Sequence, residues 1–312
     1  MQDPRFKAKP NQDLGFGQQP TQNNQRMMNK DGSSNLKRKG LPFFKPHEAY
    51  NSLIYMSWYR FWVIILTVYF LINTLFASIY LCLGKQALAG SKAKNNFEQF
   101  FDGFFFSAQT ISTVGYGHLS PSGMAASGVA AFESLLGLLA FAMATGLLYG
   151  RFSRPNSKIT YSHNMLVSPY KNTEALMLRL ANYRSNQLLD VEAELYLAYN
   201  LVIENNKTRQ FLKLNLERDK VAILATSWTI VHPITDDSPI LDLTLQQLKD
   251  SDAEFLVIIK SFDDAFAQVV HSRTSYKASE IVYGAKFISM TSTHENGLIE
   301  FDVSKIGEFY LI

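Results

Sequence analysis

Two long runs of apolar residues dominate the hydropathy pattern of the chain. Phe61–Leu81 contains no charged residue, and Met124–Tyr149 contains only one, Glu133. Each run is long enough to cross a hydrocarbon layer of about 30 Å as an α-helix. We therefore predict a pore-forming unit over residues 60–153, with two membrane-spanning helices and both chain termini on one side of the membrane.

A third apolar segment, Phe97–Gln109, lies between the two runs. Its aromatic residues recur at helical spacing, but it is too short to span a bilayer. It predicts a short helix that enters the membrane and stops. The negative end of its dipole would favour a cation.

The sequence Thr113-Val114-Gly115-Tyr116-Gly117 follows this short helix. Non-helical backbone at membrane depth must line a polar cavity, and main-chain carbonyls there can replace the water shell of K⁺. Gly115 and Gly117 permit an alternating backbone that points successive carbonyls one way. We predict K⁺ binding by Thr113–Tyr116, with the Thr113 hydroxyl at the inner end.

One chain supplies only one wall of such a site, so four chains must surround the ion. The side chains of Val114 and Tyr116 are expected to point away from the ion and brace the strand against the short helix. The alternatives are an ordinary glycine-rich turn and a phosphate-binding loop, although no Walker lysine follows.

The segments before the first span differ in character. Residues 1–40 are rich in Gln, Asn, Gly and Lys and predict a disordered segment. In residues 41–59, apolar residues recur from His47 onward at steps of three and four, which predicts an amphipathic helix at the membrane surface. The alternative is a polar extension of the first span.

Polar and apolar residues alternate in several segments after Arg154-Pro155, as in half-buried antiparallel strands. We predict a β-sandwich over residues 154–312, immunoglobulin-like in class. The expected strands are centred on 176–180, 190–195, 212–217, 221–225, 255–260, 267–271 and 286–290.

Charge and cysteine content narrow the functional classes. The net charge of +3 gives no argument for nucleic acid as a partner, and the single cysteine, Cys82, excludes an intrachain disulfide. Basic residues flank the two spans, which places both termini in the cytoplasm and the protein in the inner (plasma) membrane. They are Lys37, Arg38, Lys39, Lys45 and Arg60 before the first span, and Arg151, Arg154 and Lys158 after the second.

Five of these basic residues, Lys45, Arg60, Arg151, Arg154 and Lys158, are also candidates for holding anionic lipid headgroups. The alternative is that they only set the orientation of the spans.

In the second span, Phe141, Thr145 and Tyr149 share one helical face, and Gly137 lies one turn earlier, where a helix could bend. If this face lines the pore, four Tyr149 rings would meet near the cytoplasmic mouth and close it. The alternative is that Tyr149 is an interfacial anchor. For Glu133, structural bracing and tuning of the filter remain equal alternatives.

The pentapeptide resembles the potassium-channel signature, and most of the chain, from about Phe43 to Phe287, resembles the prokaryotic branch of the inward-rectifier potassium channels. The further matching motifs are GLLYGRFSRP (146–155), YSHNMLVSPY (161–170), SWTIVHPI (227–234), DSPI (237–240), SDAEF (251–255) and HSRTSYKASEI (271–281). The resemblance implies a homotetramer, an interfacial slide helix, a gate at the position of Tyr149, control by membrane lipids, and no cofactor beyond K⁺ ions in the filter.

The chain departs from this family at informative positions. Phe141 replaces the acid or Asn that binds magnesium or polyamines in strong inward rectifiers, which puts strong voltage-dependent block in doubt. Gln109 and Leu119 replace the acid–arginine pair that many animal members use to support the filter. These departures favour a bacterial protein.

Three other functions were weighed. A two-span potassium channel gated by a soluble ligand would carry a GxGxxG domain after the pore, and none is present. A membrane-anchored adaptor would leave the short helix and the pentapeptide unexplained. An enzyme lacks a catalytic constellation, and the histidines lack metal-ligand spacing.

Overall fold

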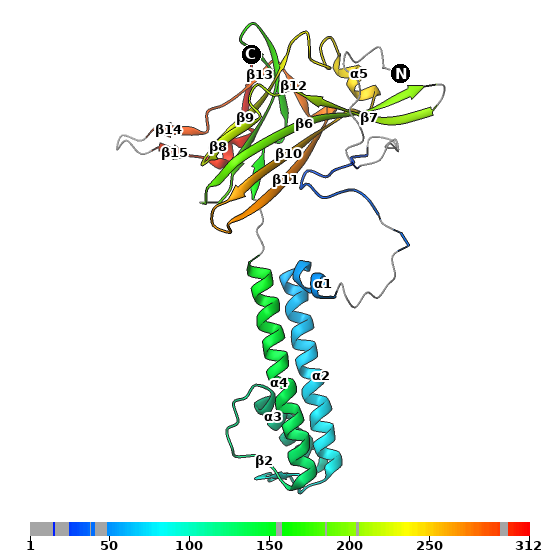
Figure 1. Cartoon of the computed structure of the whole chain (residues 1–312), viewed down its shortest axis with the longest axis vertical. Helices are drawn as coiled ribbons and strands as arrows, with labels where there is room; N and C mark the ends of the chain where they lie inside the picture. Colours follow the sequence, from blue (N-terminus) through cyan, green and yellow to red (C-terminus); the bar gives the residue numbers. More distant parts are fainter. Residues whose placement is uncertain are drawn as a thin grey trace. The chain divides into compact units, whose positions relative to one another are not determined.

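The computed structural model describes residues 15, 25–37, 39–40, 49–153, 158–184, 186–203, 206–293 and 299–312 (Figure 1). The chain divides into a helical unit, Gly40–Arg154, and a β-rich unit in which Met1–Lys39 joins Pro155–Ile312.

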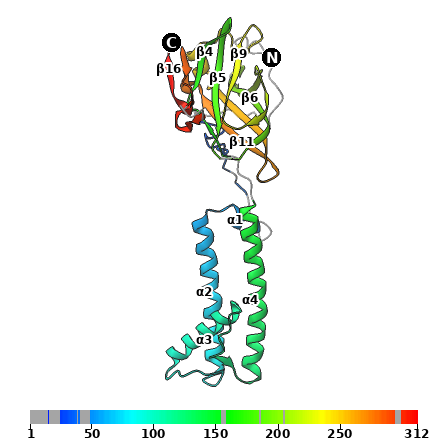
Figure 2. The same cartoon turned by 90° about the vertical axis from the view of Figure 1, so that its left-hand side faces the viewer.

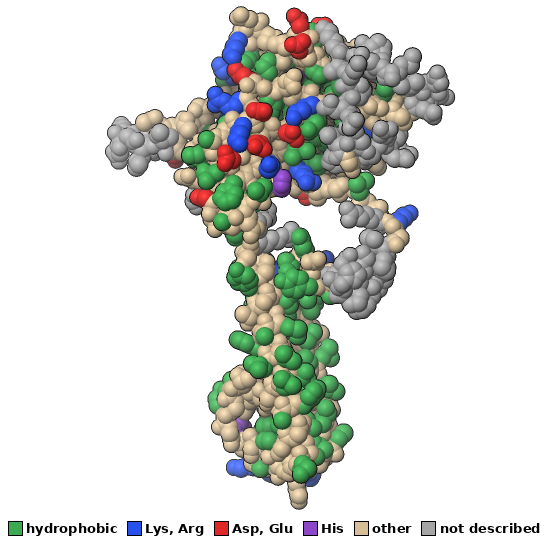
Figure 3. Space-filling model, in the orientation of Figure 1, with side chains coloured by type: hydrophobic (Ala, Val, Ile, Leu, Met, Phe, Trp, Pro, Cys, Tyr) green, Lys and Arg blue, Asp and Glu red, His purple; other side chains and the backbone are tan. Residues whose placement is uncertain are grey.

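The helical unit contains the predicted spans and the predicted short helix. Two helices are long and apolar enough to cross a membrane, α2 (Trp58–Leu83) and α4 (Gly123–Phe152). Between them lies α3 (Asn96–Ile111). Apolar side chains cover the visible outer surface of this unit (Figure 3), as expected for helices that face lipid or other copies of the chain.

Local sequence explains where these helices begin and end. The Asn95 side chain accepts a hydrogen bond from the backbone N–H of Glu98 at 2.8 Å, which caps the start of α3. At the end of α2, Gly84 has a φ of 93°, a left-handed conformation that suits glycine. The short strands β1 (Leu88–Ala89) and β2 (Ser120–Pro121) pair and close the loops outside the helices.

The amphipathic segment before α2 contains a helix in its described part. Within 41–59 the structure has α1 (Ala49–Tyr55), and residues 41–48 lie outside the described part. A break at Met56 and Ser57 separates α1 from α2, so the segment is a separate helix and not an extension of the span.

The β-rich unit is a sandwich of two five-stranded sheets, and Figure 2 shows it from the side of β4, β5 and β9. One sheet has the order β11-β10-β6-β7 with β8 also paired to β6. The other has the order β12-β4-β5-β3 with β9 also paired to β5. All pairs are antiparallel except β12 with β4. The first sheet comprises β6 (Leu188–Ile203), β7 (Asn206–Leu214), β8 (Lys220–Leu224), β10 (Glu254–Asp263) and β11 (Gln268–Lys277); the second comprises β3 (Ile159–Tyr161), β4 (Met165–Tyr170), β5 (Thr173–Asn182), β9 (Ser227–Ile234) and β12 (Ile281–Tyr283).

The main core lies between these sheets, where inward-facing residues such as Leu178, Leu195 and Val257 are fully buried. The predicted sandwich is confirmed. Two strands overlap their predicted ranges only in part: β7 begins at Asn206 and ends at Leu214, before the end of 212–217, and β13 (Ala285–Phe287) covers only the start of 286–290. The helix α5 (Leu245–Asp250) and the 3₁₀ turn η2 (Ala278–Glu280) connect strands.

The C-terminal segment folds back on the sandwich. β16 (Phe309–Leu311) pairs with β13, and β14 (Thr291–Thr293) pairs with β15 (Ile299–Phe301). Met290 and Ile306, the latter in η3 (Val303–Gly307), pack with Ala181 of β5 in a small buried cluster.

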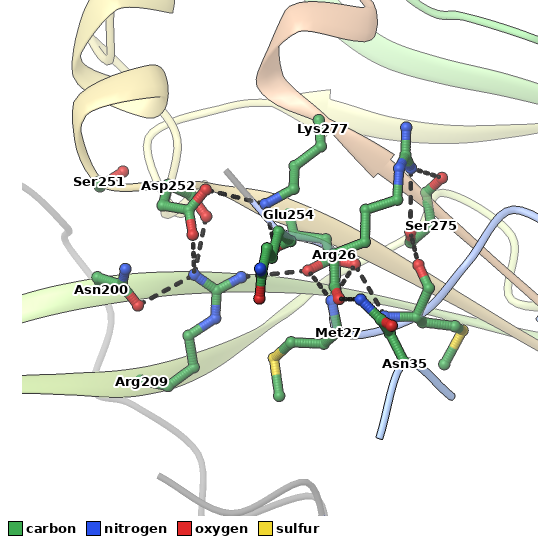
Figure 4. Close-up of polar contacts among 12 residues, drawn as sticks. Arg26, Met27, Asn35, Asn200, Arg209, Ser251, Asp252, Glu254, Ser275 and Lys277 are labelled. Carbon is green, nitrogen blue, oxygen red and sulfur yellow. Dashed lines mark hydrogen bonds and ion pairs between the residues drawn. The ribbon is translucent and has the colours of Figure 1, made fainter. Parts of the chain in front are cut away.

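Residues 25–37, here called the N-terminal strap, differ from the disorder predicted for residues 1–40. They form a turn, with Met28 paired to Ser34, that packs on the outer face of the first sheet (Figure 4). The Met27 and Met28 side chains are buried against Tyr196, Ala198, Phe211 and Leu256. The polar composition of the strap predicts disorder. The strap nevertheless binds to the sheet, in large part through its main-chain groups.

A buried carboxylate holds the strap. Glu254 is fully buried and accepts hydrogen bonds from the backbone N–H groups of Met27 (2.9 Å) and Met28 (3.2 Å). It also pairs with the fully buried Arg209 guanidinium at 3.4 Å. Lys277 donates from its Nζ to Gln25 O and to Asp252 Oδ1, both at 2.9 Å. Strap and sheet therefore share one buried charge network.

We predict that Glu254→Ala destabilises the β-rich unit by about 3–5 kcal/mol, because it leaves the Arg209 charge buried without its closest carboxylate. The strap loses two acceptors at the same time, so amide hydrogen exchange over residues 25–37 should accelerate. Thermal unfolding and hydrogen exchange of the full chain measure both effects. Glu217→Ala, which removes an exposed partner of Lys171, is the control and should change little. If the strap amides stay protected from exchange in Glu254→Ala, Glu254 does not hold the strap.

Candidate functional site

The pentapeptide lies directly after the C-terminal end of α3, and α3 shapes it through one carbonyl. Gln109 O accepts hydrogen bonds from the backbone N–H groups of Val114 (2.9 Å) and Gly115 (3.3 Å). The N–H of Thr113 bonds to Thr110 O at 3.1 Å. The chain therefore turns sharply from helix to extended backbone at the position that the sequence indicates.

The backbone of the pentapeptide alternates between two conformations. φ is positive at Thr113 (60°), Gly115 (52°) and Gly117 (83°), whereas Val114 and Tyr116 are not among the residues with positive φ. A β-branched residue such as Thr113 rarely adopts this conformation, and such strain is typical of functional sites. This is the alternation that the sequence predicts for a row of carbonyls facing one way.

The side chains of Val114 and Tyr116 are 53% and 75% exposed, respectively, in the single chain. A Cβ built on Gly115 or Gly117 would meet no atom within 4 Å. The pentapeptide is thus open on one side in the single chain, and the bracing of Val114 and Tyr116 against a short helix stays a prediction.

A buried polar cluster joins three helices close to α3. Glu133 of α4 is fully buried, and its Oε2 accepts a hydrogen bond from the Tyr80 hydroxyl of α2 at 2.7 Å. Ser107 of α3 donates to Asn73 Oδ1 of α2 at 2.9 Å, and Glu133 also interacts with Ser107. Sequence reasoning singled out Glu133 but missed its partners, whose only signal is that they are polar residues within apolar helices.

The face of α4 that was expected to line a pore is exposed in the single chain. Phe141 and Tyr149 are each 74% exposed, and Thr145, between them on this face, is exposed as well. The Thr145 hydroxyl donates to Phe141 O at 2.9 Å, so it is bonded within its own helix.

Gly137, where the sequence allows a bend, is also a point of close contact between helices. It is buried within α4, which runs from Gly123 to Phe152. A Cβ at Gly137 would lie 2.5 Å from Ile111 O and 2.8 Å from Ile111 Cα. Only glycine lets the end of α3 approach α4 this closely.

The five basic residues predicted to hold lipid headgroups have different environments. Arg60 and Lys158 are exposed, whereas Arg151 is half-buried and donates to the main-chain carbonyls of Ile54, in α1, and Met56, in the break after α1. Lys45 and Arg154 lie outside the described residues.

Comparison with known proteins identifies the family. Residues 54–154 match the family described as "Ion channel", and residues 159–312 match "Inward rectifier potassium channel C-terminal domain". The chain is 37% identical over 299 residues to the inward rectifier potassium channel Kirbac3.1 of Paramagnetospirillum magnetotacticum, covering 94% of this chain and 98% of that protein. The chain belongs to the inward rectifier potassium channel family. It is 26% identical over 199 residues to the ATP-sensitive inward rectifier potassium channel 12 of Gallus gallus, covering 60% of this chain and 46% of that protein.

A solved structure of the sporulation control protein Spo0M from Bacillus subtilis aligns with 42% of this chain and 50% of its own, at 14% identity and a TM-score of 0.23, which is too low to support an argument.

Family membership confirms the main predictions made from the sequence. The protein is a membrane protein with the function of an inward-rectifier-type potassium channel, and its fold is a two-span pore unit with a β-sandwich. The ligand-gated alternative with a different second domain does not hold, because residues 159–312 match the inward-rectifier domain.

We predict that Gly137→Ala separates the end of α3 from α4, because the added methyl group would overlap Ile111 main-chain atoms that cannot move alone. Potassium flux into liposomes and the yield of folded protein in detergent should both fall. Gly146→Ala in the same helix is the matched control, since a Cβ there meets nothing within 4 Å. Equal behaviour of the two variants would show that this close approach is dispensable.

Proposed function

We propose that four copies of the chain surround one axis and that K⁺ loses its water to the main-chain oxygens of Thr113, Val114, Gly115 and Tyr116. The observation that carries this proposal is the alternation of φ through the pentapeptide in a segment held at membrane depth. The side chains of Val114 and Tyr116 support a fourfold assembly, because in one chain more than half of each stays exposed.

The proposal includes passive conduction without catalysis and without a cofactor beyond the K⁺ ions in the filter. The end of α3 is directed toward the start of the pentapeptide, so its partial negative charge favours a cation at the inner end of the filter. Gln109 supports the filter through its carbonyl.

For Glu133 the contacts favour the bracing role over filter tuning. Its Oε2 accepts a hydrogen bond from Tyr80 of α2, which ties α4 to α2, and Ser107 ties α3 to α2 through Asn73. A buried polar group within a membrane helix is retained where it binds another helix.

The proposed gate is the ring of Tyr149 side chains, with Thr145 and Phe141 lining the cavity above it. Their exposure along one face of α4 is consistent with a pore axis on that side. Both termini are proposed to lie in the cytoplasm, on the basis of the flanking Lys and Arg residues. Anionic lipids are the proposed regulators, through Arg60 and Lys158 and through Lys45 and Arg154.

We predict that liposomes containing the protein take up ⁸⁶Rb⁺, that barium blocks this uptake, and that the protein does not conduct sodium. Gly115→Ala should reduce this uptake at least about tenfold, because each of four copies would carry a left-handed alanine at a cost of about 1–2 kcal/mol. Gly128→Ala, on a helical glycine with open space around it, is the control. Unchanged selectivity in Gly115→Ala would refute the ion-binding role of the pentapeptide.

We predict that Tyr149→Ala increases the same uptake several-fold, because removing four phenol rings widens the narrowest part of the inner mouth. Met143→Ala is the matched control, since Met143 is similarly exposed but lines the apolar groove between α2 and α4. If Tyr149→Ala conducts like the unmodified protein, Tyr149 is an interfacial anchor.

A further inference from the structure

The Arg151 side chain, at the cytoplasmic end of α4 in the proposed orientation, reaches the end of α1. Its Nη1 donates to the carbonyls of Leu53 and Ile54, the latter at 3.1 Å, and its Nη2 donates to the carbonyl of Met56 at 2.8 Å. All three acceptors belong to the last turn of α1 or to the break that follows it. Arg151 thus caps the C-terminus of α1 from a different helix.

The helix α1 needs such a cap. The last four carbonyls of a helix have no partner within the helix, and a cation there also interacts favourably with the helix dipole. The last turn of α1 contains no basic residue of its own. With seven residues, α1 is also far shorter than helices that are stable alone in water. Its cap therefore comes from α4.

The same guanidinium contacts α2. It lies 4.4 Å from the ring centroid of Trp58 and 4.5 Å from that of Phe61, both within the range of cation–π interactions. Phe152 of α4 lies 5.2 Å from Trp58 between ring centroids. The planar guanidinium can stack on rings while its N–H groups donate in a fixed fork, whereas an ammonium group has three donors on a single atom and no plane to stack. One side chain thus joins α1, α2 and α4.

The neighbouring residue confirms that α1 lies close to α4 at this point. A Cβ at Gly150 would lie 3.0 Å from the Tyr50 hydroxyl oxygen and 3.1 Å from Ile54 Cδ1. Gly150 and Arg151 follow Tyr149 directly in the chain. The contact between α1 and α4 is therefore immediately adjacent to the residue proposed as the gate.

We propose that Arg151 is a positioning residue for the gate, which holds α1 against α4 beside Tyr149, and that it is not a ligand of lipid headgroups. The proposal rests on the gate proposed above for its functional part. Both terminal nitrogens of Arg151 are directed at main-chain carbonyls, so a lipid phosphate could bind only by breaking the cap. This separates Arg151 from Arg60 and Lys158, which are exposed.

The first test measures the cap itself and does not depend on conduction. Amide hydrogen exchange over residues 49–56 is compared in the unmodified tetramer, Arg151→Lys and Arg151→Gln, each in the same anionic vesicles. Loss of charge-assisted hydrogen bonds should accelerate exchange about tenfold or more in both variants. Arg151→Lys is the decisive variant. It keeps the positive charge that a lipid site needs, but it loses the two terminal nitrogens that together bond the carbonyls at the end of α1. Arg218→Lys, at an exposed arginine between β7 and β8, is the matched control and should exchange at the unmodified rate.

If the amides of residues 49–56 exchange in Arg151→Lys at the unmodified rate, Arg151 does not cap α1. The same conclusion follows if exchange accelerates only in Arg151→Gln and only in vesicles that contain anionic lipid.

The second test measures coupling to the gate by a double-mutant cycle of ⁸⁶Rb⁺ uptake. Arg151→Lys should change uptake at least about fivefold in the unmodified chain and less than about twofold in Tyr149→Ala, because a missing gate cannot be repositioned. Equal changes in both backgrounds would overturn the positioning role. If Tyr149→Ala leaves ⁸⁶Rb⁺ uptake unchanged, the proposed gate is refuted. The hydrogen-exchange measurement would still show whether Arg151 caps α1.

Discussion

The structure depends on a short stretch of non-helical backbone that must keep its polar groups satisfied at membrane depth. The turn after α3 uses the Gln109 carbonyl to hold the N–H groups of Val114 and Gly115, and φ alternates through the pentapeptide as a row of carbonyls facing one side would require. Such a row of carbonyls is stable in a bilayer only where something replaces their lost hydrogen bonds. In a potassium channel that partner is the dehydrated ion. The strained φ of Thr113 shows that local backbone preference alone does not determine this conformation.

The surrounding helices hold this stretch through close contacts more than through apolar area. In lipid, helices associate by packing and interhelical hydrogen bonds, so small residues mark the contacts. A Cβ at Gly103 of α3 would lie 3.3 Å from main-chain atoms of Ala77 in α2, and Gly137 of α4 permits the contact with Ile111. The Tyr80–Glu133 bond adds a polar link between α2 and α4. The position of α3 is thus fixed from both neighbouring helices.

The spacing of apolar residues and the length of the apolar runs predicted those parts of the fold in which local hydropathy alone decides which side chains are buried. The spans, the short helix and the first half of β6 are examples, since Val191, Ala193 and Leu195 are buried while Glu192 and Glu194 between them are not. The second half of β6 breaks the rule: Tyr196 and Ala198 are buried on the opposite face because the strap covers them. No local pattern could show this, since the strap is polar and binds through its main chain. The partner of Arg151 was hidden for a related reason, because a basic residue at the end of a span fits a lipid headgroup and a helix C-terminus equally well.

The strap and Arg151 show the same kind of anchoring, each within its own unit. In the β-rich unit, Glu254 accepts from main-chain N–H groups of the strap and Lys277 donates to a main-chain carbonyl of the strap. In the helical unit, Arg151 donates to main-chain carbonyls at the end of α1. Bonds to main-chain groups do not depend on which side chains the held segment carries, so neither anchor leaves a signal in the sequence of the segment that it holds.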